Sequence, residues 1–205
     1  YRMVEIVDRR IGRVLDALRR KGHEGDTLVV FLSDHGDCQG AHRWNQKTVF
    51  YDESIRVPLA FRWPGVIEPG TRQHLVHTGV DLLPTLCGLA GISAPEGLPG
   101  ADLADTILGH APDERDYIVC SNHLAQGAEI DGRNPTPSGR MVRGQRYKYC
   151  VYDEGDRREE LYDMRVDPGE TENIAVYDEY RDVLRRHRRY LAEHCREHDD
   201  DFRQV

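Results

Sequence analysis

The sequence lacks three features, and each absence argues against a class of protein. No apolar run approaches the ~20 residues that a helix needs to span a bilayer, so the sequence predicts no membrane partner. Positive charge is not in excess: 28 Lys and Arg stand against 36 Asp and Glu, and the formal net charge of −8 argues against a nucleic-acid partner. None of the five cysteines forms a Cys-x-x-Cys pair, and their number is odd, so the sequence suggests neither a zinc knuckle nor a full disulfide framework. The cellular compartment and the oligomeric state stay open.

Length and composition favour a globular protein with a core of its own. The 205 residues are 39% apolar and 31% charged, and they suffice for one large domain or two small ones. The chain starts at Tyr1 rather than at Met, no signal peptide precedes its first helical pattern, and we expect it to be part of a longer protein. From about residue 111 the composition shifts to Pro, Asp, Glu and Arg. This shift predicts two domains, residues 1–110 and 111–205.

The first half of the chain alternates helix and strand patterns. Apolar residues recur at helical spacing from Val4 to Leu18, and Gly22 ends the predicted helix. Leu28–Leu32 is uniformly apolar, as parallel strands covered on both faces are, and Val57–Phe61 resembles a second strand. A helix containing Leu82 and Leu89 follows. The order predicts an α/β fold, with part of a doubly wound, mostly parallel sheet flanked by helices.

The second half has the pattern of a small α+β subdomain. Four short β-prone segments are separated by Gly, Asn, Pro and Asp, which predicts an antiparallel sheet; they are Tyr117–Cys120, Arg140–Val142, Tyr147–Tyr152 and Leu161–Tyr162. A final helix is expected over Asp178–His194. Its many arginines have acidic residues around them, which together with the net charge favours a solvated, ion-paired face over an anion-binding one.

A dense polar turn follows the first predicted strand, and it is the main candidate for chemistry. Ligands of open α/β sheets bind at the carboxyl ends of the strands, where Asp34 and His35 lie. Gly36 lets the chain turn sharply, so a carboxylate and an imidazole can reach one divalent cation. The alternative is an ordinary turn, in which both side chains only cap and hydrogen-bond the loop. The pair leaves the metal open, because oxygen ligands suit Ca²⁺ or Mg²⁺ whereas imidazole is commoner around zinc, manganese or iron.

Several motifs around this turn occur together in one known family. In chain order they are DHG at Asp34–Gly36, then Gly40, His42, Trp44 and Lys47, ESIRVPL at Glu53–Leu59, WPG at Trp63–Gly65, VDLLPTL at Val80–Leu86 and EELYDMRVDPGETENIA at Glu159–Ala175. Their order and spacing resemble the C-terminal half of a sulfatase of the alkaline-phosphatase-like superfamily. One position departs from the family pattern, because Ala41 stands where an acidic residue is usual, and we expect His42 to be structural.

The resemblance implies a sulfuric ester hydrolase that acts on a small anionic sulfate ester, either a carbohydrate or an aryl sulfate. It implies that Asp34 and His35 ligate a divalent metal, Ca²⁺ in the first place, with Mg²⁺ and Mn²⁺ as alternatives. Lys47 is the expected catalytic residue and binds the sulfate oxygens. The C-terminal subdomain of such enzymes lies beside the mouth of the active site, so His123 and Arg140 are candidates for substrate contacts.

The nucleophile of the family is not found in this chain. Sulfatases carry a C/S-x-P-S/A-R motif whose Cys or Ser is oxidised to formylglycine, and none of the five cysteines lies in such a motif. We therefore expect formylglycine in a missing N-terminal half, and we expect the chain alone to be inactive. Two alternatives remain: a phosphonate monoester or phosphodiester hydrolase of the same superfamily, and a non-catalytic fragment of the fold.

Overall fold

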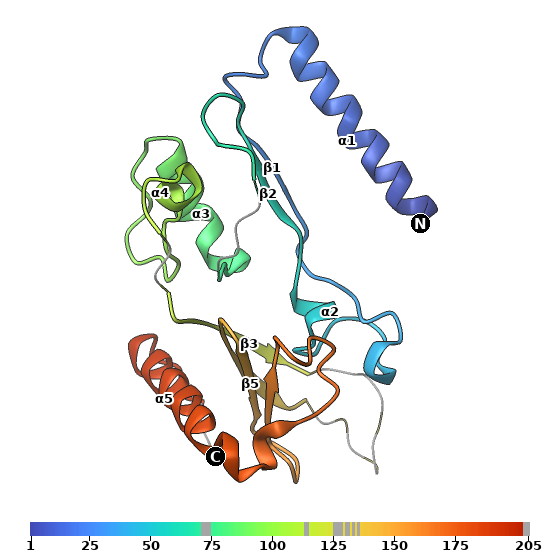
Figure 1. Cartoon of the computed structure of the whole chain (residues 1–205), viewed down its shortest axis with the longest axis vertical. Helices are drawn as coiled ribbons and strands as arrows, with labels where there is room; N and C mark the ends of the chain where they lie inside the picture. Colours follow the sequence, from blue (N-terminus) through green and yellow to red (C-terminus); the bar gives the residue numbers. More distant parts are fainter. Residues whose placement is uncertain are drawn as a thin grey trace.

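The computed structural model describes residues 1–70, 75–112, 115–124, 129, 132, 134 and 136–202. Its elements follow in the order α1 (Arg2–Lys21), β1 (Val29–Leu32), η1 (Ala41–Arg43), α2 (Asp52–Ile55), β2 (Leu59–Arg62), α3 (Thr78–Leu89), α4 (Ala104–Leu108), β3 (Tyr117–His123), β4 (Ser138–Gly144), β5 (Tyr147–Tyr152), β6 (Glu159–Asp163), η2 (Ile174–Val176), η3 (Asp178–Tyr180) and α5 (Arg181–Glu197). Figure 1 shows a ribbon of β1 and β2 that leads from α1 down to α2, with the C-terminal sheet below it. None of the described helices is long and apolar enough to cross a membrane.

The first helix confirms the periodicity of the sequence but buries none of its residues. α1 ends at Gly22, whose φ of 76° lies in the left-handed region and whose N–H donates to the carbonyls of Leu18 and Arg19. Its apolar side chains remain exposed, with Val4 at 68% and Val14 at 59%. Figure 1 shows α1 extending away from the other elements. The helix is therefore amphipathic without covering any described part of the core.

The pair β1 and β2 is antiparallel, which differs from the parallel pairing expected for Leu28–Leu32. Val29 lies opposite Arg62, and Leu32 lies opposite Leu59. A parallel pair needs a crossover of a dozen or more residues, usually a helix that returns over the sheet. Residues 33–58 contain only the short elements η1 and α2, so the chain turns back on itself instead. β1 is also partly exposed rather than covered on both faces.

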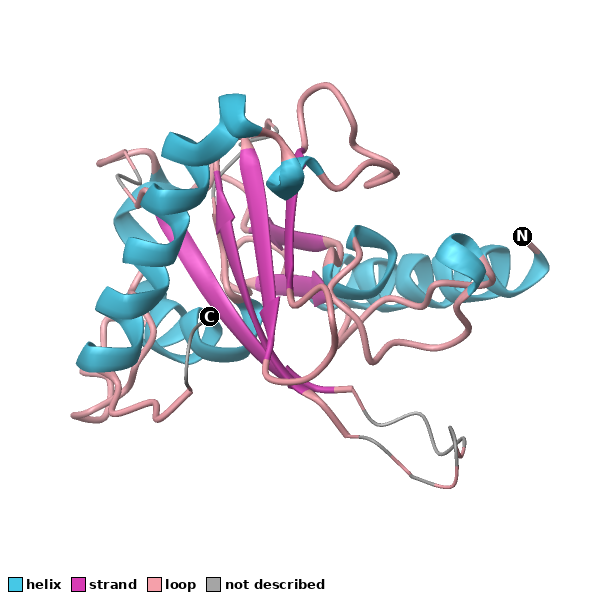
Figure 2. Ribbon diagram, turned by 90° about the horizontal axis from the view of Figure 1, so that it is seen from below, coloured by secondary structure: helices cyan, strands magenta, loops and turns pink. Residues whose placement is uncertain are grey.

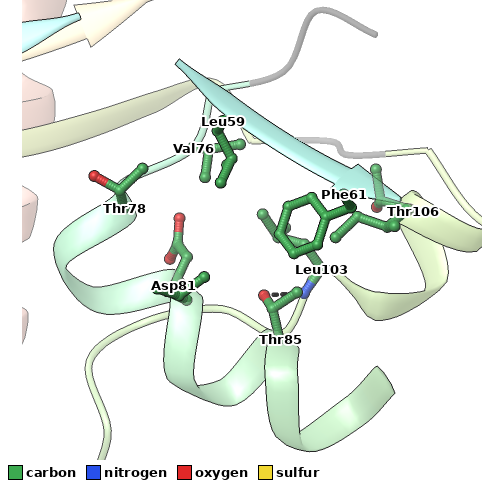
Figure 3. A pocket seen from close by; sticks show the side chains of 10 residues that line it. Leu59, Phe61, Val76, Thr78, Asp81, Thr85, Leu103 and Thr106 are labelled. Atoms are coloured by element: carbon green, nitrogen blue, oxygen red, sulfur yellow. Dashed lines mark hydrogen bonds between the residues drawn. The ribbon is translucent and has the colours of Figure 1, made fainter. Parts of the chain in front are cut away.

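Two helices pack under β2 and complete the N-terminal part. Figure 3 shows Leu59 and Phe61 of β2 above α3 and α4, around a mainly apolar cavity of about 50 Å³. Thr85 accepts the N–H of Leu103 over 3.0 Å, which ties α3 to the segment that leads into α4. The buried Asp81 carboxylate accepts the N–H groups of His77 and Ala101 over 2.7 and 2.9 Å. These polar groups are satisfied by the fold itself.

The C-terminal sheet has four antiparallel strands in the order β3-β4-β5-β6 and confirms the predicted segments. Figure 2 shows the strands side by side in one twisted sheet. One face packs against α5 and the η2 turn through a single buried cluster, made by Val119, Val142, Tyr149, Val151, Leu161, Ile174, Leu184 and Leu191. The alternate residues Met141 and Cys150 point to the other face, where they pack on Phe50 of the N-terminal part.

Several arginines of α5 form ion pairs, as the sequence predicted. Arg181 pairs with Asp178 over 2.6 Å, Arg185 pairs with Asp182 over 3.4 Å, and Arg188 pairs with Glu159 of β6. Most of these pairs are exposed, so each contributes little to stability. The attachment of α5 to the sheet therefore depends on its apolar residues.

Leu191→Ala tests this attachment. The Leu191 side chain is 0% exposed, and its truncation leaves a cavity, so we expect the free energy of unfolding to fall by about 2–5 kcal/mol. The control is Val166→Ala, at a residue that is 75% exposed, with an expected change within about 0.5 kcal/mol. Urea denaturation measures both variants, and equal losses would contradict the packing described above.

Candidate active site

The turn after β1 holds Asp34 in an exposed position with its carboxylate bonded to the backbone. Oδ1 of Asp34 accepts the N–H of His35 over 2.9 Å, while Ser33 Oγ donates to the carbonyl of His35 over 3.0 Å. The hydrogen bond from the His35 N–H lowers the pKa of Asp34 below its ordinary value, and the nearby charge of Lys47 acts in the same direction. The carboxylate is thus held ionised, as a cation ligand must be.

One ring nitrogen of His35 bonds to the backbone, and the other lies near the side chains of Asp34 and Lys47. Nδ1 lies 2.7 Å from the carbonyl oxygen of Gly36. Because a carbonyl can only accept, Nδ1 must carry the proton, which leaves a lone pair on Nε2 when the ring is neutral. Nε2 lies 3.3 Å from Oδ2 of Asp34. A backbone acceptor that fixes the tautomer in this way is typical of histidines that ligate metals.

Lys47 joins this pair although it lies 12 positions further along the chain, where its Nζ contacts Nε2 of His35. A compact loop brings it back: the N–H of Cys38 donates to the carbonyl of Gln46 over 2.8 Å. The loop includes four non-glycine residues with positive φ, namely Gln39, His42, Arg43 and Gln46. The structure therefore brings together Asp34, His35 and Lys47.

The short helix α2 fixes both sides of this arrangement. The N–H of Gly36 donates to the carbonyl of Ser54 over 2.7 Å, and Ser54 Oγ donates to the carbonyl of Lys47 over 2.5 Å. The backbones approach so closely that a Cβ on Gly36 would lie 1.9 Å from the carbonyl oxygen of Glu53. Glycine is thus required at position 36 by lack of space beside α2.

His42 and Cys38 have structural surroundings. Nε2 of His42 lies 3.4 Å from a carboxylate oxygen of Glu53, and its ring stacks on Tyr51 with the centroids 3.6 Å apart. Cys38 is buried, and burial raises the pKa of its thiol, so it is a poor thiolate ligand. The first observation agrees with the expectation of a structural histidine, and the second argues against Cys38 as a metal ligand.

No described contact connects His123 or Arg140 with the turn. Arg140 is paired with both oxygens of Asp200 over 2.6 and 2.7 Å, and its guanidinium lies 4.6 Å from the ring centroid of Phe202. His123 is exposed at the end of β3. In the described part of the chain, no hydrogen bond or ion pair links either residue to Asp34, His35 or Lys47. Their contact with a substrate stays a prediction, and the donors of Arg140 are already engaged.

Sequence reasoning missed a buried ion cluster beside the site. Lys148 of β5 contacts Asp52 and Glu170, and Asp52 is the first residue of α2. A signal was present in the segment Tyr147–Tyr152, because Lys148 alternates with Cys150 and so faces the covered side of a buried strand. A lysine in such a position requires anionic partners from another segment.

Asp34 and His35 have the chemistry of metal ligands but supply only part of a site. An ionised carboxylate and a neutral imidazole nitrogen suit a divalent cation. Nε2 of His35, in contact with Lys47, is the atom that would bind the cation. Among the described residues, no group of three or more His, Cys, Asp or Glu side chains is placed to hold a metal ion. A metal site at this turn would need further ligands from outside these residues.

Comparisons with known proteins agree with the motifs. The family model for the C-terminal part of N-sulphoglucosamine sulphohydrolase matches residues 40–197. A Delta 4,5-hexuronate-2-O-sulfatase of Bacteroides thetaiotaomicron is 39% identical over 98% of this chain and 41% of its own length. The chain thus spans about two fifths of the length of this curated relative.

Solved structures also superpose on the fold of this chain. A 2-O GAG sulfatase superposes with a TM-score of 0.84 at 40% identity, over 97% of this chain and 42% of that chain. A phosphonate monoester hydrolase from Silicibacter pomeroyi superposes with a TM-score of 0.77 at 28% identity, over 95% of this chain and 40% of that chain. These neighbours confirm the predicted α/β fold class, although the strand pair of the N-terminal part is antiparallel.

Gly36→Ala tests the close approach of α2 to the turn. The added methyl group meets the carbonyl of Glu53, so we expect the free energy of unfolding to fall by about 1–3 kcal/mol. Gly25→Ala is the matched control, because a Cβ at Gly25 meets nothing within 4 Å. Urea denaturation compares the two variants. A Gly36→Ala protein as stable as the control would show that this approach is not tight.

Proposed function

The chain belongs to the sulfatase family, and from this we propose that it is the C-terminal part of an enzyme that hydrolyses a sulfate ester. The observation that carries the proposal is the convergence of Asp34, His35 and Lys47 at the end of β1. An acid and an ammonium that both lie against one imidazole nitrogen suit a site for a cation and an oxyanion. The match over residues 40–197 supports the same function.

Lys47 is the proposed catalytic residue of this chain. Cleavage of the S–O bond moves negative charge onto the leaving oxygen and onto the other sulfate oxygens. An ammonium group at this position stabilises that charge, and it binds the sulfate group of the substrate as a point cation. Its carbonyl is held by Ser54, which fixes the backbone of the residue relative to α2, and its Nζ lies against His35.

Asp34 and His35 are the proposed metal ligands of the chain. The ionised carboxylate and Nε2 of His35 fit a divalent cation, which we propose to be Ca²⁺, with Mg²⁺ or Mn²⁺ as alternatives. Such a cation supplies Lewis acidity to the sulfate oxygens when it is bound. The hydrogen bond from His35 Nδ1 to Gly36 holds the imidazole with Nε2 available, which is the contribution of the backbone to the site.

The remaining machinery is proposed to lie outside this chain. The chain corresponds to 41% of its hexuronate-sulfatase relative, and none of its cysteines lies in a C/S-x-P-S/A-R motif. We place the formylglycine nucleophile and the further metal ligands in the N-terminal half of the whole protein. Within the chain, residues 1–110 are the proposed end of the catalytic α/β domain, and residues 111–205 form the proposed C-terminal subdomain.

The proposed substrate is a small sulfated glycan. The relative from Bacteroides thetaiotaomicron is a hexuronate-2-O-sulfatase, and one structural neighbour is a 2-O GAG sulfatase. The net charge of −8 is compatible with this class of ligand, since one lysine and one metal dominate the local field in an acidic protein. His123 remains a candidate for contact with the sugar.

A second candidate function is the hydrolysis of phosphonate monoesters or phosphodiesters. The structural match to a phosphonate monoester hydrolase favours it specifically, and the chemistry of Lys47 and the metal ligands suits phosphorus as well as sulfur. The lower TM-score and identity of that match rank it second, at 0.77 and 28% against 0.84 and 40%.

The role of Lys47 is tested in the full-length protein with a series of aryl and sugar sulfates, and with a phosphonate monoester for comparison. We expect Lys47→Met to lower kcat/KM on sulfate esters by roughly 10²- to 10³-fold, the effect of losing one preorganised charge donor.

Asp34→Asn is expected to lower the metal content of the purified protein, measured by mass spectrometry.

Lys21→Met is the control for the loss of a lysine, because Lys21 lies exposed in the last turn of α1. It is expected to retain wild-type kinetics. Wild-type rates for Lys47→Met would refute its catalytic role. A wild-type protein that hydrolyses the phosphonate faster than every sulfate would favour the second candidate function.

A further inference from the structure

The buried ion cluster of Lys148, Asp52 and Glu170 connects the C-terminal sheet to the candidate site. The side chain of Lys148 is 0% exposed. Its Nζ lies 2.5 Å from Oδ1 of Asp52 and 2.7 Å from Oε1 of Glu170, and it donates to the carbonyl of Phe50 over 3.0 Å. Both Asp52 and Phe50 belong to the segment that follows Lys47. A buried ammonium persists only when it is paired, so Lys148 holds this segment on the sheet.

Glu170 provides the second bond between the two parts. Its other carboxylate oxygen accepts the N–H of Asp52 over 2.6 Å, at the start of α2. Glu170 is buried and has a φ of 51°, which is uncommon for a residue with a side chain. Burial raises the pKa of its carboxyl, whereas the charge of Lys148 and the N–H of Asp52 oppose that shift. The unusual backbone and the burial indicate that Glu170 is placed for its contacts with Lys148 and α2.

α2 connects the contacts of Lys148 and Glu170 with the candidate site through a few residues. Asp52 receives the bonds from Lys148 and Glu170, and two residues later Ser54 bonds to both Gly36 and Lys47. Gly36 in turn accepts the hydrogen bond from His35 Nδ1. A shift of α2 would therefore move the backbones that carry both His35 and Lys47.

We propose that Lys148 and Glu170 are positioning residues for the site. They hold α2 on the C-terminal sheet and thereby set the places of His35 and Lys47. The expected effect of Lys148 and Glu170 on catalysis rests on the proposed function. Their expected effect on the position of the segment 36–55 does not depend on that function. The C-terminal subdomain then has a role in the chemistry without contributing a group that touches the substrate.

The competing explanation is that the cluster only stabilises the fold. A second buried carboxylate on the same sheet separates the two explanations. Asp163 of β6 is paired with Arg146 over 2.6 Å and has an exposed fraction of 4%, and Glu170 has one of 3%. The contacts of Asp163 go to Arg146 and to the turn at Arg165, and none of those described reaches α2.

The test uses the full-length protein with Lys148→Met, Glu170→Gln and the control Asp163→Asn. Activity is measured well below the unfolding midpoint of each variant. We expect kcat/KM on a sulfate ester to fall about 10- to 100-fold for Lys148→Met. Losses of this size are usual when a residue that orients a metal ligand without touching the metal is replaced. Glu170→Gln keeps an oxygen for the N–H of Asp52, so a smaller loss is expected. Asp163→Asn is expected to lower the unfolding midpoint but to leave kcat/KM within about twofold of wild type.

Hydrogen exchange gives a readout that does not depend on activity. In Lys148→Met the amides of Gly36 and Asp52 are expected to exchange at least tenfold faster than in wild type, because both are bonded through α2, and Glu170→Gln is expected to show a smaller increase in the same two amides. Asp163→Asn is expected to leave these two amides unchanged. If Lys148→Met fails to fold, Glu170→Gln carries the test, since it changes no volume in the cluster.

The outcomes separate this inference from the proposed function. If the wild-type protein cleaves no sulfate ester, while Lys148→Met and Glu170→Gln still exchange the amides of Gly36 and Asp52 faster than the wild type does, the function is refuted and the link is supported. An active wild type whose Lys148→Met and Glu170→Gln variants keep both kcat/KM and slow exchange would refute the link. Equal losses of kcat/KM in Glu170→Gln and Asp163→Asn would reduce the cluster to a stabilising role and would also overturn the inference.

Discussion

The close approach of α2 to the turn after β1 is the constraint on which the candidate site depends. One helix of four residues accepts the N–H of Gly36 and bonds to the carbonyl of Lys47, so it closes a loop whose ends carry His35 and Lys47. Without this contact the two side chains would belong to independent loop segments. The lack of space for a Cβ at Gly36 shows how little freedom the arrangement has. Chemistry that needs an acid, an imidazole and an ammonium in fixed places is compatible with such a loop.

The same helix joins the two parts of the chain. Phe50 packs on Met141 and Cys150 of the C-terminal sheet, and beside it the charges of Lys148, Asp52 and Glu170 are buried together. An apolar contact alone would permit several orientations, whereas a buried ammonium with three acceptors selects one of them. The site is therefore assembled from one part of the chain and held by the other, which explains why motifs of one family extend through both.

Local patterns predicted most of the elements and the core of the site. The helical period from Val4 to Leu18, the alternation in the C-terminal strands and the apolar positions of α5 are properties of short segments. Asp34, His35 and Lys47 were predicted because they follow an apolar strand in a known motif. The antiparallel pairing of β1 was missed, since a uniformly apolar strand does not encode the direction of its partner. The ion cluster was missed because Lys148 and Asp52 are 96 positions apart. The pairing of Arg140, predicted as a substrate contact, was missed for the same reason, because Asp200 is 60 positions away.

The central claim is that Asp34, His35 and Lys47 form one pocket for a cation and an oxyanion. A crystal structure of the full-length protein with its metal, located by anomalous scattering, tests this most directly. The account predicts a cation bonded to the carboxylate of Asp34 and to Nε2 of His35, with the ammonium of Lys47 displaced from that nitrogen and turned toward the substrate position. A cation bound elsewhere, with Lys47 still in contact with His35, would contradict it.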